Sequence, residues 1–229
     1  MTTPYYSDDL VTLFHGDCRE IREWLDADVL VTDPPYGISM STVADRNRPA
    51  IAGEPWIGQS SSRVIPPSHV AVRDTALELW GARPALVFGH WRAPRPVDTR
   101  MRLIWDKVIP GLGGVRPFRP TDEEIYLVGN WPNGRVGPRG SAVSSVLRHR
   151  ALRGSARPAH PTPKPVPLMA ELISYCPAGV VADPFVGSGS TLVAAKMLGR
   201  RAIGVELKER YCAMAAERLA QDALPLVVA

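Results

Sequence analysis

Residues 180–206 read VVADPFVGSGSTLVAAKMLGRRAIGVE, a pattern that predicts a strand, a glycine-bearing turn, a helix and a second strand. Gly187 and Gly189 have no side chains, so a ligand can lie against the backbone at the helix start, where free N–H groups point outward. Glu206 ends the second strand about 20 residues past the turn, where dinucleotide-type folds place the acid that binds ribose hydroxyls. Because the strict GxGxxG pattern is absent, a nucleoside site competes here with a tight turn that merely needs small residues.

The same alternation of strand and helix patterns extends over the rest of the chain. Apolar runs rich in β-branched residues predict strands at residues 28–33, 85–90, 102–107, 123–129, 179–185 and 200–206. Apolar residues at helical spacing predict helices at residues 19–27, 69–82, 165–176, 190–199 and 209–221. Strands that alternate with helices indicate an α/β fold with a mostly parallel sheet.

Two long irregular stretches interrupt this alternation. Residues 37–68 are rich in Gly, Pro, Ser and Arg, and a connection of this length is usually a functional loop. Residues 130–163 form the second stretch. The sequence shows no internal repeat, and we expect residues 1–229 to form one domain with loop inserts at 37–68 and about 130–157.

The distribution of charge is more informative than the net charge of +4. No acid occurs between Glu124 and Glu171, a stretch that holds six arginines and Lys164. The chain has 27 basic residues, of which only four are lysines, so a general preference for arginine explains part of this pattern. The lack of acids favours a surface that grips nucleic-acid phosphates over a merely solvated loop.

The composition argues against several classes of protein. Three widely spaced cysteines, Cys18, Cys176 and Cys212, provide neither a disulfide framework nor paired metal ligands, and the histidines have no metal-binding spacing. We therefore expect no bound metal. No apolar run of about 18 residues occurs, and the N-terminus lacks the layout of an export signal. These features predict a cytoplasmic protein that does not bind membranes.

A second motif, VLVTDPPYG at residues 29–37, ends a buried strand with an acid, two prolines and an aromatic ring. Such residues at the carboxyl end of a parallel strand project into the crevice where α/β folds bind ligands. Asp33 can accept a hydrogen bond from an amino group, and so can a main-chain carbonyl held by the fixed φ angles of Pro34 and Pro35. Two acceptors expose the nitrogen lone pair of a conjugated amine, and Tyr36 can stack on its ring. The pattern therefore suits alkylation of a nucleobase amine better than a plain surface turn.

The sequence also resembles a known family, the DNA amino-methyltransferases, which transfer methyl from S-adenosylmethionine to adenine N6 or cytosine N4. DPPY at 33–36 is similar to the catalytic motif of this family, and DPFVGSGST at 183–191 to its cofactor motif. HPTPKP at 160–165 and LFHGDCREI at 13–21 are similar to two further segments beside the cofactor. Because the catalytic motif precedes the cofactor motif, the order matches the circularly permuted β-type members. The resemblance implies a Rossmann-like methyltransferase fold, mostly parallel, with helices on both faces of the sheet.

The resemblance assigns expected roles to the matching residues. Asp33 and the carbonyl of Pro34, next to Pro35, are expected to bind the target amine, while Tyr36 is expected to stack on the flipped base. The residues expected to bind the cofactor are Asp17, Cys18, His160, Thr162, Lys164, Asp183, Phe185, Gly187, Ser188, Gly189 and Glu206.

Within that cofactor set, the resemblance places Glu206 on the ribose, Phe185 near the cofactor and Lys164 near the methionine carboxylate. Pro163 departs from the family pattern, which often has Gln at this point. This change is expected to affect the rigidity of the loop rather than to remove contacts.

The basic stretch lies where β-type members carry target recognition. The residues expected to contact nucleic acid are Trp131, Arg135, Arg139, Arg148, Arg150 and Arg153. A base inside a duplex cannot be reached, so enzymes of this chemistry flip the target nucleotide into the pocket. Double-stranded DNA is thus the expected partner, and since β-type enzymes often form homodimers, a homodimer is a further expectation.

The sequence therefore predicts a DNA methyltransferase that uses S-adenosylmethionine, with adenine N6 as the preferred target. Adenine is preferred because Asp opens the motif, whereas cytosine-N4 members more often begin with Ser. Three alternatives stay open: a cytosine-N4 DNA methyltransferase, a methyltransferase for RNA or a protein glutamine, and a DNA-binding module without activity. Neither the recognition sequence nor a restriction partner follows from the residues.

Overall fold

The computed structural model describes residues 2–36, 70–108, 121–132, 140–152 and 163–221. Within these residues, nine strands form one sheet in the order β1-β2-β9-β8-β3-β4-β6-β5-β7. The strands are β1 (Tyr6–Ser7), β2 (Val11–His15), β3 (Val29–Thr32), β4 (Ala85–Gly89), β5 (Thr99–Asp106), β6 (Asp122–Val128), β7 (Val146–Arg148), β8 (Val181–Asp183) and β9 (Ala202–Glu206). The predicted loop insert at 37–68 lies outside the described residues.

The centre of the sheet is parallel, and antiparallel pairs occur in both flanks. β2, β9, β8, β3 and β4 pair in parallel, so their carboxyl ends all reach the same edge of the sheet. β6 runs antiparallel to β4 and to β5, and β7 is parallel to β5. The amino end of β6 and the carboxyl ends of β5 and β7 therefore lie at that same edge. We call it the carboxyl edge.

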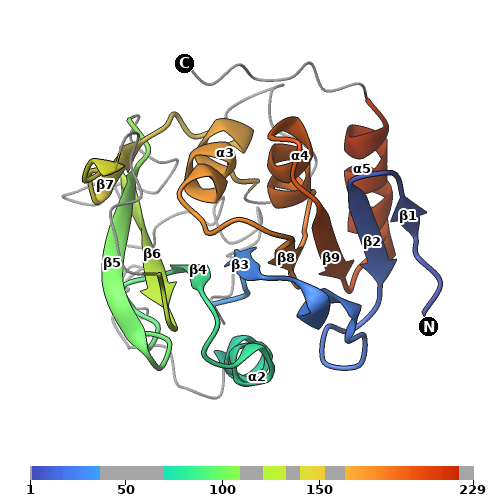
Figure 1. The fold of residues 1–229 in the computed structure, drawn as a ribbon, viewed down its shortest axis with the longest axis horizontal. Coiled ribbons are helices and arrows are strands. Elements are labelled where there is room, and N and C mark those ends of the chain that lie inside the picture. Colours follow the sequence, from blue (N-terminus) through green and yellow to red (C-terminus); the bar gives the residue numbers. More distant parts are fainter. Residues whose placement is uncertain (1, 37–69, 109–120, 133–139, 153–162, 222–229) are drawn as a thin grey trace, which may run out of the picture.

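Helices cover both faces of this sheet, as Figure 1 shows. α3 (Val166–Ser174), α4 (Ser190–Met197) and α5 (Glu209–Ala220) lie on one face, while α2 (Ala71–Trp80) and the short 3₁₀ helix η1 (Glu23–Asp26) lie on the other. The predicted α/β fold, with its mostly parallel sheet between helices, is confirmed. Among the described residues, no helix combines the length and the apolar character that a membrane span needs.

The helix predicted at residues 19–27 is wrong, because only the four residues of η1 are helical there. The indole N–H of Trp24 donates to the carbonyl of Cys18 at 2.9 Å, and its ring stacks on Trp80 with 5.8 Å between centroids. Burial of this one large side chain folds the segment into a tight turn. The strands β1, β2 and β7 were not predicted; β7 has a single buried residue, Leu147, and so lacks an apolar run.

Alternate side chains of the central strands supply the two halves of the core. On β3, Val29 and Val31 join the cluster under α3 and α4, whereas Leu30 joins the cluster around Trp24 and Trp80. This period of two is what a strand buried on both faces requires. The sequence signal for such a strand is a continuous apolar run, which is why β3 was predicted correctly.

A glycine on β9 allows the turn after β8 to pack closely on the sheet. A Cβ built at Gly204 would lie 2.4 Å from Cγ2 of Val186 and 2.8 Å from Cδ1 of Leu192. Val186 belongs to the glycine-bearing turn, and its amide donates to the carbonyl of Val205 at 3.1 Å. The absence of a side chain at Gly204 therefore fixes how near the turn approaches β9.

We expect Gly204→Ala to lower the free energy of unfolding by about 1–3 kcal/mol, because the added methyl overpacks a closed site. Urea titration followed by circular dichroism measures this loss. Val186→Ala removes the atom that the new methyl would meet, so the double variant should be more stable than the sum of the two single losses. Strict additivity of the two changes would contradict the proposed clash.

Candidate active site

The two motifs that dominate the sequence meet at the carboxyl edge. β3 and β8 are neighbours, and the hydroxyl of Thr32 at the end of β3 donates to Oδ1 of Asp183 at the end of β8, at 2.7 Å. Both groups are buried. The segment that begins with Asp33 and the turn that contains Gly187 therefore leave adjacent strands at one edge of one sheet.

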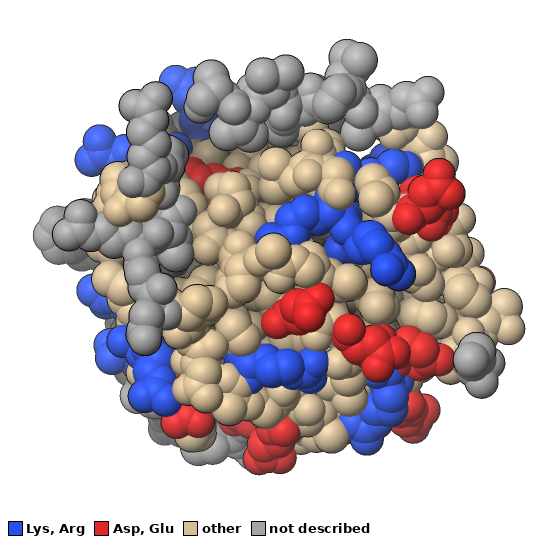
Figure 2. Space-filling model, viewed as in Figure 1, with Lys and Arg blue, Asp and Glu red and all other residues tan. Residues whose placement is uncertain are grey.

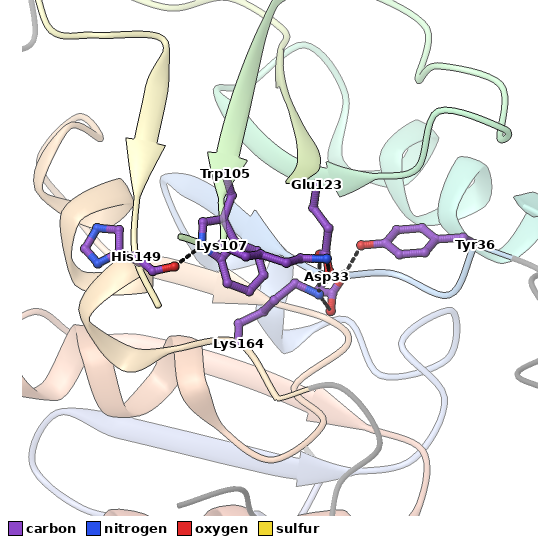
Figure 3. A network of polar contacts seen from close by, with 7 residues as sticks. All are labelled: Asp33, Tyr36, Trp105, Lys107, Glu123, His149 and Lys164. Carbon is purple, nitrogen blue, oxygen red and sulfur yellow. Dashed lines mark hydrogen bonds and ion pairs between the residues drawn. The ribbon is translucent and has the colours of Figure 1, made fainter. Parts of the chain in front are cut away.

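Asp33 is held by two donors from different parts of the chain (Figure 3). The hydroxyl of Tyr36 donates to Oδ1, and the ammonium of Lys164 donates to Oδ2 at 2.5 Å. The side chain of Asp33 keeps 22% of its surface exposed. Burial raises the pKa of Asp33, and the nearby charge of Lys164 opposes that rise. The carboxylate is thus fixed in orientation while still open to an incoming group.

Lys164 continues this contact into a chain of charges. Its side chain is only 6% exposed, and its Nζ lies 3.1 Å from Oε2 of Glu123, within ion-pair range but without the alignment of a hydrogen bond. Lys107 pairs with the other oxygen of Glu123 at 2.9 Å. Burial alone would raise the pKa of Glu123 and lower that of Lys164. The opposite charges around them outweigh burial, so the pKa of Glu123 is lowered and that of Lys164 is raised.

The glycine-bearing turn is anchored on Glu206. The amide of Gly187 donates to Oε2 of Glu206 at 2.8 Å, and the amide of Lys208 donates to Oε1 at 2.9 Å. Gly187 and Gly189 have φ angles of 53° and 86°, which side chains rarely adopt. A Cβ on Gly189 would also lie 2.9 Å from that of Ala215 on α5. Both glycines are therefore required by the backbone itself.

Asp183 is the most strongly buried acid at this edge, with 2% of its surface exposed. Its Oδ1 also accepts the amide of Phe185 at 3.0 Å. Burial raises the pKa of Asp183 to about 7, although hydrogen bonds from Thr191 and Thr32 lower it in part. The group is thus tied into the turn, and it changes charge near neutral pH.

The segment after β2, which contains Asp17 and Cys18, lies beside the same turn. In the β2–β9 ladder His15 stands opposite Glu206, and the amide of Gly16 donates to the carbonyl of Glu206 at 3.0 Å. Asp17 and Cys18 follow directly. Burial raises the pKa of the Cys18 thiol to about 11, so this residue is a neutral, apolar wall rather than a nucleophile.

Phe185 packs against the cluster of buried residues that contains Cys18. Ser188 is buried, and its carbonyl accepts a hydrogen bond from the guanidinium of Arg218 on α5. The cofactor residues predicted within the described chain therefore gather along β2, β9 and β8, except Lys164, which lies on Asp33. His160 and Thr162 lie outside the described residues.

Aromatic rings follow one another from the DPPY segment toward the surface. The centroids of Tyr36 and His90 are 6.3 Å apart, and those of His90 and Trp91 are 5.7 Å apart in a stacked arrangement. His90 and Trp91 follow β4 at the carboxyl edge, and Trp91 is 66% exposed. Burial raises the pKa of Tyr36 well above its ordinary value, which keeps its phenol neutral.

The residues predicted to contact nucleic acid are divided by the structure. Arg148, at the carboxyl end of β7, is 76% exposed and lies 3.5 Å from Asp106, and Arg150 is exposed just beyond it. Trp131 instead follows the end of β6 at the opposite edge, where its indole donates to the carbonyl of Val128 at 3.0 Å. Arg135, Arg139 and Arg153 lie outside the described residues.

Charge on the face seen in Figure 2 is mixed, since patches of both signs lie close together there. That face therefore shows no continuous basic surface among the residues described. Within the same residues, no group of three or more His, Cys, Asp or Glu side chains could hold a metal ion.

Several residues of the site were not singled out from the sequence. Glu123, Thr32 and Arg218 become visible only through contacts with residues far away along the chain. Lys107 differs from them, because the sequence already places it at the end of a strand that faces the same crevice, where it is expected to pack and pair. A weak signal existed for Glu123, which is a charged residue at the end of a predicted strand and so reaches the ligand-binding edge when the strand direction is known.

We expect the pH dependence of stability to reveal Asp183. Its pKa is about 7 when folded and about 3.8 when unfolded, so the unfolded chain releases this proton first. As the pH rises from about 3.8 to about 7, the free energy of unfolding should therefore fall by about 1.4 kcal/mol per pH unit through this group alone. Asp183→Asn should flatten the slope of the unfolding free energy, measured with urea from pH 5 to pH 8. Equal slopes in both proteins would contradict a buried, late-ionising Asp183.

Comparison with known proteins agrees with this geometry. A sequence profile of N6/N4 DNA methylases, described as "DNA methylase", matches residues 80–217. The type II methyltransferase M2.DpnII of Streptococcus pneumoniae is 47% identical over 257 residues, covering 96% of this chain and 93% of that protein.

Solved structures share the fold. The complex of M1.HpyAVI with SAM has a TM-score of 0.65 at 20% identity, covering 92% of this chain and all of that one. The cytosine-N4-specific PvuII DNA methyltransferase has a TM-score of 0.63 at 15% identity, covering 97% and 91%. With its two motifs joined at one sheet edge and a profile match over more than half its length, the chain belongs to the N6/N4 DNA methylase family.

Proposed function

We propose that this protein is a DNA methyltransferase that transfers a methyl group from S-adenosylmethionine to the exocyclic amine of a flipped base, with adenine N6 as the preferred target. The observation that carries the proposal is the hydrogen bond between Thr32 and Asp183. It joins the segment that holds the proposed amine acceptor to the glycine-bearing turn that is proposed to hold the nucleoside. The family membership and the relatives named above support the same activity.

The residues at the carboxyl edge fit the proposed cofactor. Glu206 is a buried acid whose oxygens each accept one backbone amide, which leaves a lone pair on each oxygen for a ribose hydroxyl. Gly187 and Gly189 leave the backbone of the turn bare, and Asp17 and Cys18 form the neighbouring wall. S-adenosylmethionine, when bound, supplies a methyl group that its sulfonium charge makes electrophilic. Like M1.HpyAVI, which was solved with SAM, this chain carries the fold that surrounds such a ligand.

Asp33 and the carbonyl of Pro34 are proposed to bind the two hydrogens of the amine. The contacts of Tyr36 and Lys164 each use one lone pair on a different oxygen of Asp33, so each oxygen can still accept another hydrogen bond. Amine, methyl and sulfur must lie in line for transfer, and a fixed acceptor supplies much of the rate by holding that geometry. Tyr36 is proposed to stack on the base and so to orient its ring.

The DNA is proposed to lie across the carboxyl edge. β7 stands four strand positions from β3 in the sheet, which is about 19 Å at the usual strand spacing. Arg148 and Arg150 thus lie about one duplex width from Asp33, within reach of phosphates that flank an extruded base. Exposed Trp91 lies on the same edge. A role of Trp131 on DNA, a homodimer and a cytoplasmic location stay predictions from the sequence.

The target atom is the finer part of this proposal. The acid at the start of DPPY favours adenine, while the similarity to the cytosine-N4-specific PvuII enzyme makes cytosine N4 the second candidate. Incubation with methyl-labelled cofactor and unmodified duplex DNA, followed by analysis of the nucleosides, separates the two. N4-methylcytosine as the product would reject adenine, and label in RNA but not in DNA would reject the substrate class.

We expect Asp33→Ala to reduce methyl transfer by about a hundredfold or more, because it removes an acceptor aligned with the reacting amine. Cofactor affinity, measured by calorimetry, should change little. Near-normal turnover of the variant would show that Asp33 does not bind the amine. Asp8→Ala, which removes an acid paired with Lys196 elsewhere on the chain, is a suitable control.

Glu206→Ala should instead weaken cofactor binding about tenfold or more, since hydrogen bonds to a charged acceptor are lost together with an anchor of the turn. Calorimetric titration with S-adenosylmethionine measures the change. Glu206→Gln retains the size of the side chain and separates loss of charge from loss of shape. Unchanged affinity in both variants would rule out the ribose assignment.

A further inference from the structure

Lys164 carries a contact that the proposed function does not explain. The resemblance to the family places this lysine near the methionine carboxylate, yet its ammonium lies on Asp33. It is almost fully buried, and a buried ammonium needs paired acceptors to offset the loss of water. Its ion-pair partners are two carboxylates, Asp33 and Glu123. The pairing thus links the amine acceptor to the β5–β6 pair of strands.

We propose that Lys164 is a positioning residue for Asp33: its ammonium, anchored by Glu123, keeps the Asp33 carboxylate ionised and oriented as the acceptor of the target amine. This inference rests on the proposed function for its role in methyl transfer. The contact itself concerns the protein alone and can be tested without activity. Figure 3 shows the three side chains converging from separate elements.

An ionised Asp33 matters because a protonated carboxyl loses acceptor capacity. The neutral acid donates through its own O–H, whereas the carboxylate only accepts. Burial favours the neutral form of Asp33, and Lys164 is the cation placed directly against it. An opposite charge within about 4–6 Å of an acid lowers its pKa by about 1–3 units. Lys164 therefore counteracts the rise in the pKa of Asp33 that burial causes.

The rigidity of the arrangement comes from Glu123 and Lys107. Glu123 stands at the beginning of β6 and Lys107 directly after β5, two strands joined by a long antiparallel ladder. Lys107 pairs with Oε1 of Glu123, and this leaves Oε2 facing Lys164. The ring of Phe88 lies 4.9 Å from the ammonium of Lys164 and closes another side. Two acids and two cations thus balance within the cluster.

The sign of each effect on Asp33 follows from the charges that surround it. These groups are Lys164 from the segment before α3, Glu123 from β6, Lys107 from the end of β5, Asp183 from β8, His90 from the end of β4, and Tyr36 from its own segment. Removal of Lys164 deprives Asp33 of its cation and leaves Glu123 without one of its partners. Both consequences raise the pKa of Asp33.

The first experiment measures the pKa of Asp33 directly by carbon NMR of aspartate labelled at the carboxyl carbon. The Asp33 signal is assigned by its loss in Asp33→Asn. In Lys164→Met the pKa should rise by about one unit or more. A variant that merely loosened the pocket would admit water and lower this raised pKa, so the direction separates charge from damage. A pKa that stays unchanged or falls overturns the proposal.

Lys196→Met is the matched control. Lys196 also forms an ion pair at 2.6 Å, but with Asp8, and it lies on α4 away from Asp33. Its removal should leave the pKa of Asp33 where it was. An equal rise in both lysine variants would mean that the effect is not specific to Lys164, and would also overturn the proposal.

A second measurement covers the case in which Lys164→Met does not fold. The chain has only four lysines, so a protein labelled at the lysine ε-carbon gives a simple spectrum. Asp33→Asn and Glu123→Gln preserve the size of each side chain, and each should move the Lys164 signal while those of Lys196 and Lys208 stay in place. A Lys164 signal that does not respond to Asp33→Asn contradicts the pairing.

Kinetics and calorimetry then distinguish a lysine that positions Asp33 from a lysine that binds the methionine carboxylate of the cofactor. For a positioning residue, Lys164→Met should lower turnover about tenfold or more at pH 7, with partial recovery at higher pH, and keep the affinity for S-adenosylmethionine within about twofold. Loss of affinity with an unshifted pKa of Asp33 would instead place Lys164 on the methionine carboxylate. Absence of methyl transfer in the unmodified protein would reject the proposed function, while the NMR result would still decide the pairing.

Discussion

The parallel pairing of β3 with β8 is the constraint on which the site depends. These strands are far apart along the chain, and beyond the last paired residues of their short ladder the hydrogen bond from Thr32 to Asp183 joins the two strand ends. Because both side chains are buried, the bond cannot be replaced by water without cost. The start of the DPPY segment, which holds the proposed amine acceptor Asp33, is thereby fixed relative to the glycine turn. Without this register, the two motifs would be separate loops on a common scaffold.

The boundary between β3 and β8 also separates two kinds of environment at the carboxyl edge. On the side of β8, β9 and β2, backbone amides and the acid Glu206 surround a bare turn. On the side of β4, β6 and β5, alternating charges and a row of rings surround Asp33. A nucleoside needs hydrogen bonds and close backbone approach, whereas an amine needs a rigid charged acceptor. The two halves of the sheet provide these separately, and the reacting groups would meet where they join.

The sequence was informative where a function is encoded by consecutive residues. The turn from Asp183 to Gly189 and the run from Val29 to Tyr36 combine a strand signal with residues of special backbone geometry, so the fold could be predicted there, while the roles of their side chains stay predictions. Glu123 could not be predicted, because its importance arises from Lys164 across the sheet. The same holds for the position of Trp131, since it depends on the antiparallel direction of β6, which the apolar pattern does not reveal. The segment around Trp24 was wrongly predicted as a helix, because its apolar residues have helical spacing although they fold into a turn that buries one indole ring.

The interleaved strand order has a consequence for synthesis on the ribosome. β3 is made early, but its neighbour β8 emerges only after most of the chain, and β2 must likewise wait for β9. Until then the nascent chain exposes apolar strand edges that have no native partner. Pairings this distant along the chain also slow folding, since loop closure precedes any gain from contact. The sheet can therefore be completed only after β8 and β9 have emerged, and until then the early strands are expected to depend on protection from aggregation.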